Sequence, residues 1–113
     1  MKRSRIPGLL VGLSLLVSYL ASADNIEMLG AGKVSCSEWK TLRDSNEYFS
    51  AGNWVLGFLS GTAWDSGRNI LSGQQPSRLF VFIDNYCEPH KQETISDAAV
   101  ALAYFLLGTE QPE

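Results

Sequence analysis

The sequence predicts an all-α fold, a small bundle of about four helices tied by one disulfide, and three observations support this prediction. Apolar residues recur at helical spacing in segments between residues 36 and 107. The chain has only two cysteines, Cys36 and Cys87. Its first 23 residues have the composition of an export signal, which would place both cysteines where a disulfide persists.

The export signal has three parts. Met1–Arg5 is basic, residues 6–20 are almost entirely apolar, and Ala21-Ser22-Ala23 is a small-x-small cleavage site. We expect cleavage after Ala23, a single helical domain over residues 24–113, and a periplasmic or secreted location. The alternative is an uncleaved anchor, but the apolar run is shorter than the roughly 20 residues that a membrane span needs.

The chain that remains after cleavage is acidic. The full sequence carries nine Lys and Arg and twelve Asp and Glu, a net charge of −3. Lys2, Arg3 and Arg5 leave with the signal, so six basic residues face twelve acidic ones and the net charge becomes −6. Nucleic acids and anionic membranes select basic surfaces. We therefore expect neither as a partner; a cationic partner is permitted, but an acidic surface most often serves only solubility.

We expect Cys36 and Cys87 to form a disulfide, because they are the one cysteine pair of an exported chain. In the loop-closure model this bond removes unfolded-chain entropy worth about 4 kcal/mol. That is a large contribution for a domain with a modest core. The alternative is two free, buried thiols.

The first half of the domain predicts two helices after an irregular lead-in over 24–33. Residues 36 to about 49 are polar with spaced apolar side chains, which suits a surface helix. Residues 53–64 are apolar and uncharged, which predicts a buried helix. Gly57 and Gly61 lie four residues apart on one face of it, where the missing side chains would let another helix of the chain approach closely.

The second half begins with a loop over 70–77 that is the best-placed segment for a protruding partner contact. Four residues of this loop are candidates for that contact: Gly73, Gln74, Gln75 and Pro76. Pro76 could open the next segment, in which residues 78–87 fit a helical face and also have strand propensity. We choose a helix because no nearby segment offers a partner strand, and the disulfide then joins the first helix to the third.

The last helix has the clearest boundaries. Thr94 is a suitable N-cap, and Asp97 completes a capping-box pair three residues later. A face of apolar side chains follows, and Gly108 ends the helix. A second set of apolar residues on its other side predicts either deep burial or a face for a partner.

Residues suited to catalysis or metal binding are sparse. His90 is the one histidine, and no second His or Cys completes a metal site beside it. Ser77 or Ser96 with His90 would be needed for a hydrolase, but no motif supports that pairing. The carboxylate pairs Asp84/Glu88 and Glu93/Asp97 have helical spacing and are interpreted as a solvated face. We expect no enzymatic activity, metal or cofactor, with a minor hydrolase as the last alternative.

Three segments resemble small exported bacterial helical proteins, above all the HdeA/HdeB periplasmic acid-chaperone group. They are Ser35–Trp39 (Ser-Cys-Ser-Glu-Trp), Trp54–Gly61 (Trp-Val-Leu-Gly-Phe-Leu-Ser-Gly) and Ile83–Cys87 (Ile-Asp-Asn-Tyr-Cys). The resemblance implies a homodimer at neutral pH that opens in acid and exposes apolar surface to unfolded clients. Protonating twelve carboxylates would turn the net charge from −6 to clearly positive, which supplies a physical driver.

The same format also resembles the periplasmic immunity proteins that neutralise peptidoglycan amidase toxins of type VI secretion. That resemblance implies a preformed surface that plugs a toxin's active-site cleft, with loop 70–77 as the candidate. The sequence thus predicts an exported protein-binding protein, with an acid-stress chaperone as the first hypothesis and an immunity protein as the alternative.

Overall fold

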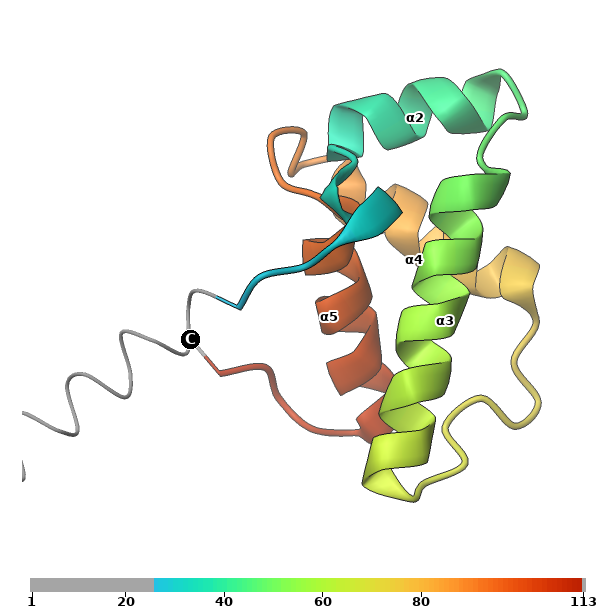
Figure 1. The fold of residues 1–113 in the computed structure, drawn as a ribbon, viewed down its shortest axis with the longest axis vertical. Coiled ribbons are helices and arrows are strands. Elements are labelled where there is room, and N and C mark those ends of the chain that lie inside the picture. The colour runs from blue at the N-terminus through green and yellow to red at the C-terminus, as the bar shows by residue number, and fades with distance from the viewer. Residues whose placement is uncertain (1–25, 113) are drawn as a thin grey trace, which may run out of the picture.

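The structure is a computed structural model that describes residues 26–112, so the predicted signal over 1–23 lies outside the described residues. Four α-helices follow a short 3₁₀ helix, η1 (Gly30–Lys33). They are α2 (Cys36–Asp44), α3 (Phe49–Ser66), α4 (Pro76–Cys87) and α5 (Ile95–Leu107). Cys36 and Cys87 form a disulfide. The predicted all-α bundle with one disulfide is confirmed for the described residues (Figure 1).

The core lies where α3, α4 and α5 meet. In Figure 1, α3 lies in front of α4 and beside α5, while α2 lies across one end of the bundle. Six large side chains are almost completely shielded from solvent: Trp39, Val55, Leu59, Ile83, Ile95 and Leu102. No helix of the described part of the chain is long and apolar enough to cross a membrane.

The predicted end of α4 and both predicted boundaries of α5 are confirmed, while α4 begins at Pro76, two residues before the predicted segment. Pro76 occupies the first turn of α4, where its missing N–H costs no helical hydrogen bond, and residues 78–87 are helical. Thr94 caps α5 in a full capping box with Asp97. Gly108 ends α5 in the left-handed conformation, with φ 73°.

Helix α2 is shorter than predicted, and α3 begins earlier. Asn46 adopts a left-handed φ of 60°, which few residues other than glycine and asparagine tolerate. The N–H of Glu47 then donates to the carbonyl of Leu42 at 2.8 Å, a pattern that closes a helix C-terminus. The predicted end near residue 49 is therefore wrong, and Phe49 instead begins α3.

The prediction that α3 is buried through Gly57 and Gly61 is wrong within the described chain. Both glycines are exposed, and a Cβ built at either would meet nothing within 4 Å. Trp64, on the same side of α3, is 90% exposed. The close approach is made at Gly52 instead, where a Cβ would lie 2.9 Å from Cζ of Phe80.

Because Gly61 is open to solvent and Gly52 is packed against Phe80, alanine at these two positions of α3 is expected to change the free energy of unfolding in opposite directions. Gly61→Ala is expected to raise the free energy of unfolding by about 0.5–1 kcal/mol, because alanine restricts the unfolded chain and meets no neighbour. Gly52→Ala is expected to lower it by about 1–3 kcal/mol, because the Phe80 ring is packed and would have to move. Denaturant titrations at one low protein concentration would check both, and equal signs would contradict the packing described.

Candidate functional site

A charged hollow of about 440 Å³ lies between α2 and α4 beside the disulfide. Charged side chains of both signs line it: Lys40, Arg43, Asp44, Asp84, Glu88 and Lys91. At its rim Lys40 pairs with Asp44 at 3.3 Å and Lys91 pairs with Glu88 at 3.2 Å. Because these rim pairs are exposed, each contributes little to stability.

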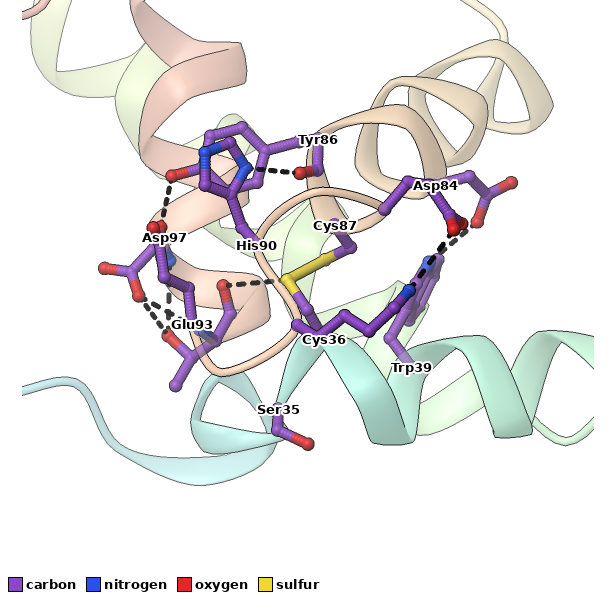
Figure 2. Close-up of a disulfide and its surroundings, with 12 residues drawn as sticks. Ser35, Cys36, Trp39, Asp84, Tyr86, Cys87, His90, Glu93 and Asp97 are labelled. Carbon is purple, nitrogen blue, oxygen red and sulfur yellow. Dashed lines mark hydrogen bonds and ion pairs between the residues drawn. A yellow bond between two sulfur atoms is a disulfide. The ribbon is translucent and has the colours of Figure 1, made fainter.

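One carboxylate accepts the side-chain hydrogen bonds that join the two helices. Asp84 of α4 accepts from Trp39 Nε1 at 2.7 Å, from Arg43 Nε at 3.0 Å and from Arg43 Nη2 at 2.7 Å (Figure 2). Among the described residues, every side-chain hydrogen bond between α2 and α4 ends on Asp84. The interpretation of Asp84 as part of a solvated face is wrong. We call Trp39, Arg43 and Asp84 the Asp84 latch.

The latch lies over an aromatic cluster. The guanidinium of Arg43 stands 4.6 Å from the ring centroid of Tyr48 and 5.7 Å from that of Trp39. Trp39, Tyr48 and Phe80 contact one another edge to face, with centroids 5.6–6.0 Å apart. The hydrogen bond to Asp84 raises the pKa of Arg43 above its usual value, so this cation stays charged. Its charge is therefore balanced by the carboxylate it contacts.

The opposite end of α2 is fixed in a different way. Cys36 is the first residue of α2 and Cys87 the last of α4, and the bond between them is almost completely buried. The N–H of Cys36 donates to the carbonyl of Glu93 at 2.7 Å, and that of Ser37 to Lys91 at 3.1 Å. These bonds satisfy donors that a helix start leaves free. The start of α2 is thus held by the disulfide and by two backbone hydrogen bonds, whereas its end is held by the Asp84 latch.

A second polar cluster joins α4 to the loop that precedes α5. The hydroxyl of Tyr86 donates a hydrogen bond to Glu93, and His90 stacks on the Tyr86 ring with centroids 4.3 Å apart (Figure 2). Asp97 belongs to the Thr94 capping box. The interpretation of the pair Glu93/Asp97 as a solvated face is therefore wrong for Glu93, which is partly buried, while Asp97 is exposed and caps α5. Burial, and then the bond to Glu93, raise the pKa of Tyr86 above its usual value.

The raised pKa of Tyr86 predicts a loss of stability in alkali. A group whose pKa is higher in the folded state stabilises it fully below the unfolded pKa, about 10 for tyrosine, and loses that contribution as the pH rises further. Above about pH 10, the free energy of unfolding of Tyr86→Phe should fall less steeply with rising pH than that of the parent chain. Stability measured in urea at several alkaline pH values checks this, with Tyr104→Phe as the control, and identical slopes would contradict it.

Among the described residues, no hydrogen bond joins His90 to Ser77 or to Ser96. Nδ1 of His90 lies 2.6 Å from the carbonyl of Tyr86, and the hydroxyl of Ser96 lies 2.7 Å from that of Thr94. Ser77 is exposed in the first turn of α4. Within residues 26–112 no group of three potential metal ligands occurs.

Loop 70–77 links α3 to α4 and is mostly exposed, as its predicted role requires. Ile70 is buried at its start, and Gly73 has φ 76°. Gln74 and Gln75 are exposed, while Pro76 already belongs to α4. The loop between α3 and α4, which carries these candidate residues, lies at one edge of the bundle (Figure 1).

Comparison with protein-family models, with curated proteins and with solved structures gives no match to this chain. Sequence reasoning missed the Asp84 latch, although one signal was present. Asp84 directly follows Ile83, a core residue, and precedes Cys87 by three positions, so it had to lie near the disulfide and the helix tied by it.

Proposed function

We propose that the protein binds other proteins in acid, as an exported stress chaperone of the kind that the HdeA/HdeB resemblance suggests. The observation that carries the proposal is the convergence of the α2–α4 side-chain hydrogen bonds on Asp84. A carboxylate differs from a carbonyl or hydroxyl acceptor because acid removes its negative charge. Protonating it would leave Arg43, which is only 25% exposed, without a counter-charge.

The proposed acid response is a movement of α2, in which one end stays attached and the other is released. The disulfide and two backbone hydrogen bonds hold its start, so loss of the latch would let its far end move away from α4. That movement would uncover Trp39, now 1% exposed, and Phe80, now 9% exposed. Large aromatic side chains supply the apolar contact area that unfolded clients require. The disulfide limits the opening and keeps α2 attached for return at neutral pH.

A pH titration of the disulfide-bonded mature chain tests this function. Lowering the pH should increase binding of an apolar dye and should suppress aggregation of an unrelated acid-unfolded protein, and both effects should reverse at neutral pH. Reduced and alkylated protein is the control, because it lacks the covalent hinge. If the oxidised chain gains neither dye binding nor client protection in acid, the chaperone proposal fails.

The exposed loop 70–77 favours a second candidate, an immunity protein for an exported amidase toxin. The buried Ile70 anchors one end of the loop and Pro76 begins a helix at the other, so its tip is presented from two fixed points. A toxin complex at neutral pH should be weakened by Gln74→Lys and Gln75→Lys together. An unchanged complex, or none with such a toxin, would remove this candidate.

A further inference from the structure

The charged hollow beside the disulfide has the size of a small-molecule site. Its volume of about 440 Å³ falls within the range of about 300–1,000 Å³ that such sites occupy. Three residues of its wall, Cys36, Trp39 and Cys87, are almost completely buried. The disulfide and the hydrogen bond from Trp39 to Asp84 join the two helices that form it (Figure 2). The hollow is therefore preformed, which lowers the cost of binding a ligand.

The charges around the hollow are balanced, although the full sequence carries a net charge of −3. Three cations and three carboxylates line it: Lys40, Arg43, Lys91, Asp44, Asp84 and Glu88. A site with both charges in equal number favours neither a simple anion nor a simple cation. It suits a molecule that carries both charges, because each charged end then meets a group of opposite sign.

We infer that the hollow binds a small zwitterion, namely a free amino acid or a short peptide with unblocked ends. Lys40 and Lys91 would donate to the ligand's carboxylate. Asp44 and Glu88 would accept from its ammonium group. Among the described residues each of these four side chains forms one ion pair, and all four are exposed. Because exposed pairs contribute little to stability, exchanging these partners for a ligand costs little.

The remaining wall of the hollow supplies an apolar contact and keeps its shape. The disulfide and the indole of Trp39 offer a surface for a small aliphatic side chain of the ligand. The Asp84 latch retains its own hydrogen bonds, so α2 and α4 need not move for the ligand to enter. We expect a Kd of about 1 mM, because the ligand is small and the ion pairs lie in solvent.

Titration of the mature, disulfide-bonded chain with L-alanyl-L-alanine at neutral pH, followed by NMR, tests the site. The indole N–H signal of Trp39 should shift and saturate, because Trp39 lines the hollow, whereas that of the exposed Trp64 on α3 should not. Acetylating the amino end or amidating the carboxyl end should each weaken binding at least about fivefold, because each removes one of the two charges. Free L-alanine is the second probe: equal binding identifies an amino-acid site, and weaker binding identifies a peptide site.

A double variant tests which side chains hold the ligand. Lys40→Gln with Lys91→Gln removes both lysines of the hollow and should weaken dipeptide binding at least about fivefold. The matched control is Lys33→Gln with Arg78→Gln, which removes the same charge from two exposed positions outside the hollow. The control should change the Kd less than about twofold. All four changes are at exposed side chains, so both variants should fold as the parent chain does.

A Trp39 signal that shows no saturable shift up to about 50 mM dipeptide, well above the expected Kd, would overturn the inference. So would equal binding of the blocked peptides, or an equal loss of binding in the two double variants. The inference goes beyond the proposed function and does not rest on it, because binding is measured at neutral pH. Failure of acid-induced client binding would leave the zwitterion site intact, and loss of dipeptide binding would leave the acid response of the Asp84 latch intact.

Discussion

Replacing Cys36 and Cys87 together by alanine is expected to lower the free energy of unfolding by about 4 kcal/mol, most of the stability of a small domain. The bond closes a loop between positions 51 residues apart, so the unfolded chain gains much freedom when it is lost. It also joins the first residue of α2 to the last of α4. Denaturant unfolding of the variant and the oxidised parent chain would measure the difference.

Reduced parent protein is the control for that variant. It loses the covalent link but keeps both sulfur atoms in the core, where Cys36 is 1% and Cys87 4% exposed. An equal loss in both proteins would assign the effect to the cross-link, and a larger loss in the alanine variant would assign the excess to lost packing. A loss below about 1 kcal/mol in both would contradict a structural role for the bond.

The sequence predicted the bundle because local signals and the hydrophobic pattern agreed. The Thr94–Asp97 capping box, Pro76 in the first turn of α4 and the left-handed Gly108 are each local, and the structure has all three. The end of α2 was missed because Asn46, not a glycine, provides the left-handed residue. Asparagine is a weaker signal in sequence, since it is also common in ordinary turns.

The candidate site was harder to predict because it depends on distant contacts. Asp84 and Arg43 are 41 residues apart, and no local pattern distinguishes a carboxylate that holds two helices together from one in solvent. The packing prediction for the glycines of α3 was wrong for a related reason. Their spacing placed both glycines on one face of the helix, but it could not tell whether another helix of the chain packs against that face.

Asp84→Asn is expected to have the largest effect on function, because it removes the charge that balances Arg43 without removing an acceptor for Trp39. At neutral pH it should lower the free energy of unfolding by about 1–3 kcal/mol. It should also bring dye binding at neutral pH toward the level that the parent chain reaches in acid. The matched control is Asp44→Asn, which removes an exposed partner of Lys40 in the same hollow and should cost less than about 0.5 kcal/mol.

The double variant Arg43→Met with Asp84→Asn separates the latch from a general effect of acid. It has no partly buried cation to leave unpaired, so at neutral pH it should be more stable than Asp84→Asn alone. Its α2–α4 contact would no longer contain an ion pair that protons can break, so its dye binding should rise less in acid than that of the parent chain. If the double variant opens at the same pH and to the same extent as the parent chain, the trigger lies in other carboxylates and not in Asp84.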